Sequence, residues 1–367
     1  THEGEELSAA AVRAGYLLAG NPSQITDASA FCSKLAPYIP RGEDWCKERL
    51  ADNTRVYVEL EPQVSEDDAK IIEELEIDGA LLYRNQWRYY PGGSVAARSV
   101  GFIGYTEDGG SELHGKYGLE RQYDDVLFRE NEILSVNFFA ELFSNLGDIV
   151  TTLEPSVSRM LDTILLETNK HYDSKLTGAI IMNPKNGEIY AMNAVPTYDL
   201  NNRVEADIAQ FRNPLVEDVY EFGSTIKALT MAAGLDSGAI TRGSTYYDAG
   251  YIDLDTFTIK NFDGKGRGTV AMQAVLNQSL NTGVSWIVKQ MGKERFRDYF
   301  LSYKLGSESG IDLPNEAYGL IDNLNSPRDV EYATASFGQG IAMTTIAVTR
   351  ALATLGNGGH LVTPHLV

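Results

Sequence analysis

Two apolar segments joined by a tight turn constrain the fold more than any other part of this sequence. Residues 177–182 read TGAIIM, residues 189–195 read IYAMNAV, and the turn-forming residues 183–187, NPKNG, lie between them. This pattern predicts an antiparallel hairpin. Because residues 179–182 are apolar throughout, we expect the hairpin to lie in the buried middle of a sheet covered by helices. The sequence thus predicts an α/β scaffold that can carry a site.

A helical pattern before this hairpin suggests where one domain ends and the next begins. In residues 155–172 the apolar side chains recur at helical spacing, namely Val157, Leu161, Ile164 and Leu165. We place the domain boundary near Gly147, which predicts domains at 1–147 and 148–367.

The first domain carries mixed signals. Ser65 followed by acidic residues is typical of a helix N-terminus. Residues 79–150 are rich in aromatic and β-branched residues punctuated by glycine, which predicts strands and turns. The expected fold of this domain is mixed α+β.

The charge of the chain excludes some partners. The formal net charge is −20, with 13 basic and 27 acidic residues up to Val150 (−14) and 18 and 24 beyond it (−6). Such a surface repels phosphate backbones and anionic lipid heads. We expect no nucleic-acid partner.

Cys32 and Cys46 are the two cysteines of the chain. A bond between them would close a loop of about 15 residues and stabilise the fold by roughly 3 kcal/mol. Such a bond needs an oxidising compartment, whereas two free buried thiols would suit the cytosol equally well. The sequence leaves both alternatives open.

Membrane, metal and cofactor signals are weak. No run approaches the roughly 20 apolar residues of a membrane helix, and no glycine-rich phosphate loop is present. No pairing typical of a metal helix occurs among the histidines, which are His2, His114, His171, His360 and His365. We expect neither a metal nor a cofactor.

The strongest chemical signal is Ser224 with Lys227 three residues later, at the head of an apolar helix. Residues three apart lie on one face of a helix, so the two side chains can reach each other. A serine hydroxyl is a good nucleophile only when a neighbour takes its proton, and a lysine can do so only when burial keeps it neutral. Gly223 is expected to permit close backbone approach, and the helix N-terminus offers N–H donors for an oxyanion. The alternative is a serine N-cap with a snorkelling lysine.

A second signal follows some 55 residues later, where Ser279 and Asn281 lie two apart in LNQSLNTGV. In a loop or extended backbone such residues project to the same side. Ser279 could relay a proton while Asn281 holds a substrate amide. Taken alone this pattern is a weak signal, because Ser-x-Asn is also common in turns and caps.

The sequence resembles the class B penicillin-binding proteins, which are membrane-anchored transpeptidases of the bacterial cell wall. The resemblance covers most of the chain in the family's order: RYYPGGSVAARSVGFIGY, GKYGLERQYDDVL, TGAIIMNPKNGEIYAMNAVPTYDLN, NPLVEDVYEFGSTIK, LNQSLNTGV and ASFGQGIAMTTIAVTRALATLGNGGHLVTPHLV. It implies an antiparallel sheet with helices on both faces, as in serine β-lactamases. It also implies that 1–147 is a non-catalytic pedestal of the dimerisation type.

By this resemblance Ser224 is the acyl acceptor, Lys227 its base, Ser279 a further catalytic residue and Asn281 a substrate-binding residue. Ser224 would attack the penultimate D-alanine carbonyl of a stem peptide and pass the acyl group to a neighbouring amine. β-Lactams would acylate the same serine. Implied partners are a membrane glycan polymerase and other wall-assembly proteins of elongation or division.

The chain departs from the family in two places. Phe222 stands where proline is usual, which we expect to loosen the turn. The family's third motif, Lys-Thr-Gly or a relative, would follow Val367, and Lys265 is no substitute for it. We therefore expect an envelope ectodomain without its N-terminal membrane helix and without the last part of the transpeptidase domain, which would acylate poorly as a fragment.

Two other functions use the same residues. A serine β-lactamase or D-alanine carboxypeptidase would share Ser224 and Lys227, although a β-lactamase seldom carries 150 residues of additional domain. A non-catalytic penicillin-binding scaffold would account for Phe222 and the absent third motif.

Overall fold

The computed structural model describes residues 6–105, 113–127, 147–203, 206–254 and 256–367. Its contacts divide the chain into two compact units, Leu7–Pro91 and Gly92–Val367. Each unit has its own hydrophobic core. We describe them separately.

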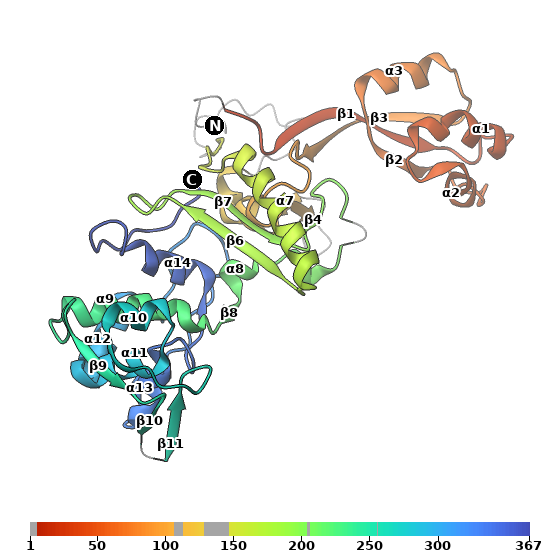
Figure 1. Cartoon of the computed structure of the whole chain (residues 1–367). Helices are drawn as coiled ribbons and strands as arrows, with labels where there is room; N and C mark the ends of the chain where they lie inside the picture. The colour runs from red at the N-terminus through yellow and green to blue at the C-terminus, as the bar shows by residue number, and fades with distance from the viewer. Residues whose placement is uncertain (1–5, 106–112, 128–146, 204–205, 255) are drawn as a thin grey trace. The chain divides into compact units, whose positions relative to one another are not determined.

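The first unit is a three-stranded antiparallel sheet covered by short helices. Strand β1 (Ala11–Gly20) pairs with both β2 (Val58–Val64) and β3 (Ala80–Tyr89) (Figure 1). The helices are α1 (Ala28–Leu35), the 3₁₀ turn η1 (Ala36–Tyr38), α2 (Gly42–Arg49) and α3 (Glu66–Glu74). Ser65 caps α3 as predicted, since its Oγ accepts a hydrogen bond from the Asp68 backbone N–H at 3.1 Å.

A disulfide links the first two helices of this unit. Cys32 on α1 and Cys46 on α2 are bonded, and both side chains are fully buried. Of the two alternatives that the sequence leaves open, the structure has the disulfide. The bond fixes α1 against α2 within the unit's core.

The second unit begins with short elements and continues into the hairpin. They are α4 (Ala97–Val100), β4 (Ile103–Tyr105), β5 (Leu113–Gly115), α5 (Gly118–Gln122), α6 (Asp124–Leu127), α7 (Pro155–Tyr172), β6 (Thr177–Met182), β7 (Ile189–Val195), η2 (Ile208–Gln210), α8 (Pro214–Glu217) and β8 (Val219–Tyr220). The part that carries the candidate site follows, with η3 (Gly223–Ile226), α9 (Lys227–Asp236), β9 (Thr245–Asp248), β10 (Tyr251–Leu254), β11 (Phe257–Lys260), β12 (Gly268–Ala271), α10 (Met272–Asn277), α11 (Asn281–Met291), α12 (Lys293–Ser302), η4 (Asp322–Asn325), α13 (Asp329–Ala335), β13 (Met343–Thr344) and α14 (Thr345–Ala353).

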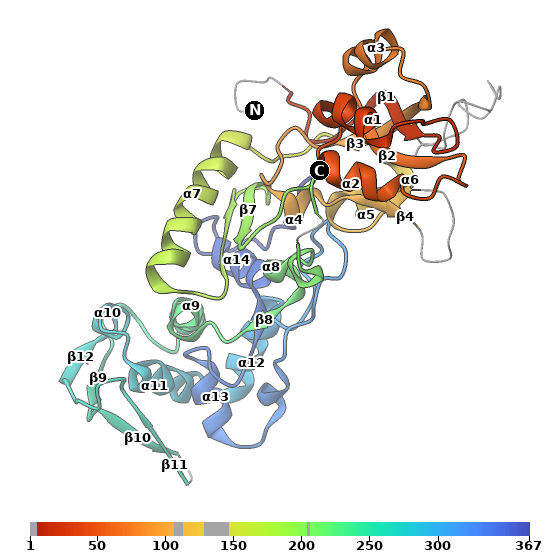
Figure 2. The same cartoon turned by 90° about the vertical axis from the view of Figure 1, so that its right-hand side faces the viewer.

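The predicted hairpin is present as β6 and β7, with helices on both of its faces. On one face Leu161 and Leu165 of α7 pack against Ala191 and Val195. On the other face, residues of α8 and α14 pack against alternate residues of the hairpin, in a cluster of Ile180, Met182, Met192, Ala194, Leu215, Val216 and Ile346. Figure 2 shows α7 and α14 beside β7. The predicted fold class, an antiparallel sheet between helices, is confirmed.

The expectation that the hairpin lies in the middle of a sheet is wrong for the described residues, in which β6 and β7 form a sheet of two strands. The burial of the hairpin and of α7 also differs from the expectation. Strand β7 is buried almost throughout, whereas β6 is only partly covered and Ile181 is exposed. On α7, Leu161 and Leu165 are buried but Ile164 is 47% exposed. At 100° per residue, Ile164 lies at the edge of the stripe that Leu161 and Leu165 define, so it faces outward.

Segments before the expected boundary pack with the hairpin. Ser99 on α4 donates a hydrogen bond to the Met192 carbonyl at 3.1 Å, and Leu119 on α5 belongs to the core around Met192. These contacts place residues from Gly92 onward in the second compact unit. The family boundary near Gly147 remains a prediction, since a compact unit need not coincide with a family domain.

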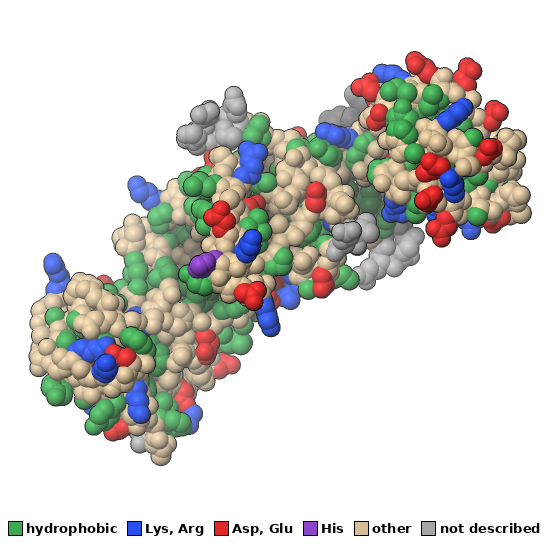
Figure 3. Space-filling model, turned by 45° about the vertical axis from the view of Figure 1, so that its right-hand side comes forward, with side chains coloured by type: hydrophobic (Ala, Val, Ile, Leu, Met, Phe, Trp, Pro, Cys, Tyr) green, Lys and Arg blue, Asp and Glu red, His purple; other side chains and the backbone are tan. Residues whose placement is uncertain are grey.

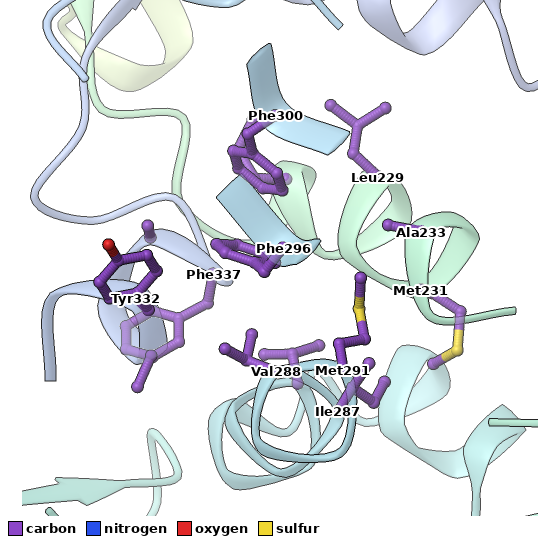
Figure 4. Packing of buried hydrophobic residues seen from close by; sticks show 14 of the residues in the cluster. Leu229, Met231, Ala233, Ile287, Val288, Met291, Phe296, Phe300, Tyr332 and Phe337 are labelled. Carbon is purple, nitrogen blue, oxygen red and sulfur yellow. The ribbon is translucent and has the colours of Figure 1, made fainter. Parts of the chain in front are cut away.

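A helical core supports the candidate site. Figure 4 shows side chains of α9, α11, α12 and α13, and of Phe337 after α13, meeting in one buried cluster. The labelled helix residues are Leu229, Met231, Ala233, Ile287, Val288, Met291, Phe296, Phe300 and Tyr332. This cluster fixes α9, which follows Ser224, against α11, which begins at Asn281.

Acidic and basic side chains are interspersed on the face shown in Figure 3, and the described residues there form no continuous basic surface. Within the described ranges, no helix combines the length and the apolar character needed to cross a membrane.

Candidate active site

Ser224 lies in the first turn of a helix, as predicted, but that turn is 3₁₀. Residues Gly223–Ile226 form η3, and α9 continues from Lys227. The Ser224 side chain is exposed, whereas Lys227 is only 2% exposed. The first N–H groups of a helix have no acceptor within it, so the Ser224 N–H is available to a developing oxyanion.

Glycine is needed at two positions beside Ser224, for different reasons. Gly223 has φ of +56°, but a Cβ there would meet no atom within 4 Å. The protein leaves room for a side chain at Gly223, so its backbone conformation is what favours glycine there, although the Gly338 backbone does approach the Gly223 backbone closely. Gly338 is the residue at the close approach, because a Cβ there would lie 2.3 Å from the Gly223 carbonyl oxygen.

The loop at Gly338 holds the segment before Ser224 in place. The Gly223 N–H donates to the Gly338 carbonyl at 3.1 Å, and the Gly340 N–H donates to Glu221 Oε1 at 2.7 Å. The Thr230 hydroxyl on α9 donates to the Ser336 carbonyl at 2.8 Å. These bonds fix the loop on both sides of Gly338 to the segment that carries Ser224.

Ser279 is in a backbone conformation that the sequence does not reveal. It lies between α10 and α11 with φ of +51°, a region that non-glycine residues rarely adopt. The Leu280 N–H donates to the Val275 carbonyl at 2.9 Å, which holds the turn closed. The turn directs the Ser279 hydroxyl toward Ser224, at 2.9 Å between the two Oγ atoms.

Lys227 lies among three oxygen atoms of Ser279 and Asn281. Its Nζ is 2.7 Å from the Ser279 carbonyl oxygen, 2.9 Å from Ser279 Oγ and 2.7 Å from Asn281 Oδ1. The prediction that Ser279 and Asn281 project to the same side agrees with these distances. Within the described residues, no carboxylate lies within ion-pair distance of this amine.

The link between Ser224 and Lys227 runs through Ser279. The described hydrogen bonds join Ser224 Oγ to Ser279 Oγ and Ser279 Oγ to Lys227 Nζ, each at 2.9 Å. The sequence predicted that Ser224 and Lys227 reach each other directly. The described hydrogen bonds include no direct bond between these two side chains, and Ser279 Oγ is bonded to both of them; the relay role of Ser279 stays a prediction.

Burial changes the acid–base chemistry of Lys227. It lowers the pKa of this amine to about 8, because water is excluded from the charged form. The surrounding acceptors are all uncharged oxygens, so no opposite charge restores the ordinary value. A substantial neutral fraction at physiological pH is what a general base requires.

The Asn281 side chain is held at both ends. Its Oδ1 accepts from Lys227 Nζ, and its Nδ2 donates to the Lys260 carbonyl at 2.9 Å. This fixes which end of the amide faces the lysine. One N–H and one lone pair remain for a ligand, so binding of a substrate amide by Asn281 remains a prediction.

The sequence reasoning missed several residues of this site. Gly338 and Glu221 shape the approach to Ser224, and Lys260 contributes only its backbone carbonyl. The glycines of ASFGQG were the available signal for the loop. A carbonyl acceptor has no signature in the sequence, because every residue carries one.

No group of three or more histidine, cysteine, aspartate or glutamate side chains within the described ranges has the arrangement of a metal site. The groups that the structure brings together at Ser224 are two hydroxyls, an amine and an amide. Such a set is suited to acyl transfer.

Comparison with known families identifies the chain. Residues 177–367 match the penicillin-binding protein transpeptidase domain, and residues 8–141 match the penicillin-binding protein dimerisation domain. The chain belongs to the penicillin-binding protein transpeptidase family. The matched range 177–367 contains Ser224, Lys227, Ser279 and Asn281.

Individual relatives agree with this assignment. Stage V sporulation protein D of Bacillus subtilis is 28% identical over 364 residues, covering 94% of this chain and 55% of its own length. Peptidoglycan D,D-transpeptidase FtsI of Escherichia coli is 28% identical over 313 residues, covering 83% of this chain and 52% of its own. The chain spans about half the length of the curated relatives it matches.

A solved structure shares the fold. Penicillin binding protein 2X from Streptococcus thermophilus aligns with a TM-score of 0.71 and 23% identity, over 97% of this chain and 58% of its own. At this identity the similarity shows that the two chains share a fold.

Proposed function

We propose that the protein is a peptidoglycan D,D-transpeptidase that cross-links stem peptides through an acyl-enzyme on Ser224. The observation that carries this proposal is the chain of hydrogen bonds from Ser224 Oγ through Ser279 Oγ to the buried Lys227 Nζ. The family assignment and the relatives with transpeptidase names support it.

In the proposed reaction, Ser224 Oγ attacks the penultimate D-alanine carbonyl carbon. Its proton passes to Ser279 Oγ as the Ser279 proton passes to neutral Lys227, and the oxyanion is stabilised by the Ser224 N–H. Collapse of the tetrahedral intermediate breaks the peptide bond, and the released D-alanine amine takes the proton back. The amine of a second stem peptide then attacks the ester carbonyl carbon, which forms the cross-linking amide bond and breaks the ester bond. The proton lost by this amine returns through Lys227 and Ser279 to Ser224 Oγ.

We propose Asn281 as a substrate-binding residue, since its amide retains one free donor and one free acceptor position. β-Lactams would acylate Ser224 because their strained amide presents the same carbonyl chemistry. No step of this mechanism requires a metal or a cofactor.

The proposed setting is the cell envelope, with a single N-terminal membrane helix and the catalytic domain outside the cytoplasmic membrane. The disulfide between Cys32 and Cys46 is consistent with an oxidising compartment. A membrane glycan polymerase and other wall-assembly proteins are the proposed partners. We propose the family's domain division, with 1–147 as the pedestal and 148–367 as the transpeptidase part.

Mass spectrometry of the full-length protein after incubation with a β-lactam tests the proposal. We expect a lasting adduct on Ser224, no adduct in Ser224→Ala, and an unchanged adduct in Ser302→Ala, a serine on the exposed part of α12. Rapid turnover of the β-lactam would indicate a β-lactamase, and no adduct at all would indicate a non-catalytic scaffold.

A second assay separates the transpeptidase from a D-alanine carboxypeptidase. The full-length protein is given a pentapeptide stem substrate with and without an acceptor amine, and the products are identified by mass. We expect a cross-linked product that requires the acceptor. Release of D-alanine by water alone, with no cross-linked product, would contradict the transpeptidase.

A further inference from the structure

A buried carboxylate that is hydrogen-bonded to the start of α11 has no part in the mechanism above. Asp248, the last residue of β9, is 1% exposed. A buried charge is tolerated only when hydrogen bonds replace its lost water. The groups that donate hydrogen bonds to Asp248 therefore show which segments of the chain this carboxylate holds together.

Four donors converge on this carboxylate from three segments of the chain. Oδ1 accepts from the Gly250 N–H at 2.9 Å and from the Thr282 hydroxyl at 2.8 Å. Oδ2 accepts from the Arg267 N–H at 3.1 Å and from Asn261 Nδ2 at 3.0 Å. The side chain thus joins the end of β9, the segment after β11 and the start of α11.

One of the two side-chain donors lies next to Asn281 itself, and the other lies next to a residue that holds the Asn281 amide. Thr282 follows Asn281 in α11, and Asn261 follows Lys260, whose carbonyl accepts from Asn281 Nδ2. Asn261 also accepts from the Thr282 N–H at 3.3 Å through its Oδ1. Asp248 is therefore bonded to the residue after Asn281 and to the residue after Lys260, whose carbonyl supports the Asn281 amide.

The start of α11 needs this external support. Its N-cap residue is Leu280, which makes no side-chain cap. Asn261 accepts one of the otherwise unpaired N–H groups, and the negative charge of Asp248 lies at the positive end of the helix dipole. These interactions set where α11 begins and hence where Asn281 points.

We propose that Asp248 is a positioning residue for the acylation centre: it fixes Thr282 and Asn261, and through them it orients Asn281 toward Lys227. This inference rests on the proposed function. All described hydrogen bonds of Asp248 go to groups other than Ser224 and Lys227, so its effect is indirect.

The test uses the full-length protein and a fluorescent penicillin, with the limiting acylation rate and the half-saturating concentration measured separately. We expect Asp248→Asn to lower the limiting rate by about 10-fold or more, because small misplacements of positioning groups cost rate. The half-saturating concentration should stay within about twofold. An unchanged limiting rate would overturn the proposal.

The matched control is Asp253→Asn on β10. This carboxylate is exposed and accepts from the Thr258 hydroxyl at 2.6 Å within the β10–β11 hairpin. We expect acylation to be unaffected by this change. An equal loss in both variants would overturn the specific role of Asp248.

A double-mutant cycle shows whether Asp248 acts through Asn281. We expect Asp248→Asn to lower the rate by less than about twofold in an Asn281→Ala background, because the group it positions is already absent. Additive losses would assign Asp248 a different effect and overturn the proposal.

A second pair of variants decides the question if Asp248→Asn does not fold. Thr282→Ser keeps the hydroxyl that Asp248 accepts from, whereas Thr282→Val removes it. We expect the serine variant to stay within about threefold of wild type and the valine variant to fall about 10-fold. Equal rates in the two would refute the proposal.

The results that would refute the proposed function differ from those that would refute the role of Asp248. A wild-type protein that is never labelled at Ser224 refutes the acyl-transfer function itself. A labelled wild type beside an unaffected Asp248→Asn refutes only the role of Asp248.

Discussion

The pKa of Lys227 predicts how acylation depends on pH. With a pKa of about 8, about 10% of this amine is neutral at pH 7. At the ordinary value of 10.5, about 0.03% would be neutral, so burial raises the competent fraction roughly 300-fold. The neutral form is the base, so the rate should rise with pH.

The assay is the limiting rate of acylation of the full-length protein by a fluorescent penicillin between pH 6 and pH 9.5. We expect about a tenfold rise from pH 6 to pH 7, an inflection near pH 8 and a plateau above it. Loss of free penicillin is followed in parallel, because the drug itself hydrolyses at high pH.

Two variants assign the inflection to the lysine. Lys227→Met should lower the rate by about 100-fold or more, the range of general-base contributions, and remove the inflection. Lys265→Met is the matched control, since Lys265 is exposed in the turn before β12, and its profile should equal that of wild type. A flat profile from pH 6.5 to 9, or an inflection that survives Lys227→Met, would refute the reasoning.

Further predictions concern the groups around the site and the first unit. Asn281→Ala should slow acylation by about 10-fold or more, measured with the same penicillin, because Lys227 loses an acceptor that orients it. Gly338→Ala should lower stability by about 3 kcal/mol or more in thermal unfolding, because its Cβ would overlap the adjacent backbone; Gly264→Ala, with φ of +66° and no atom within 4 Å, should cost only about 1 kcal/mol. Replacing both cysteines by serine should destabilise the first unit by roughly 3 kcal/mol, measured by denaturant unfolding of that unit.

Local features of the fold were predictable because the sequence alone sets them. The hairpin follows from an apolar strand on each side of NPKNG, and the helix after Ser65 follows from its cap. The orientation of Ile164 was not predictable, since burial at the edge of a helical stripe depends on what packs against it.

The sequence drew attention to Ser224, Lys227, Ser279 and Asn281, but it did not predict how they are connected. The spacing of Ser224 and Lys227 predicts a shared helix face, yet the described link passes through Ser279. That link depends on the positive φ of Ser279, which no propensity of serine predicts. Asp248 was missed because its donors lie up to 34 residues away and meet only in the fold.

The arrangement reconciles two opposing needs of a lysine that acts as a base. The amine must be held in one orientation, which calls for strong acceptors, and it must also lose its proton easily, which excludes a nearby carboxylate. Here its acceptors are a carbonyl, a hydroxyl and an amide, and burial alone accounts for its lowered pKa. The charge of Asp248 orders the neighbouring segments through Thr282 and Asn261, and the described hydrogen bonds and ion pairs of Asp248 do not include Lys227. A carboxylate in direct contact with the amine would hold Lys227 equally well but would raise its pKa and remove the base.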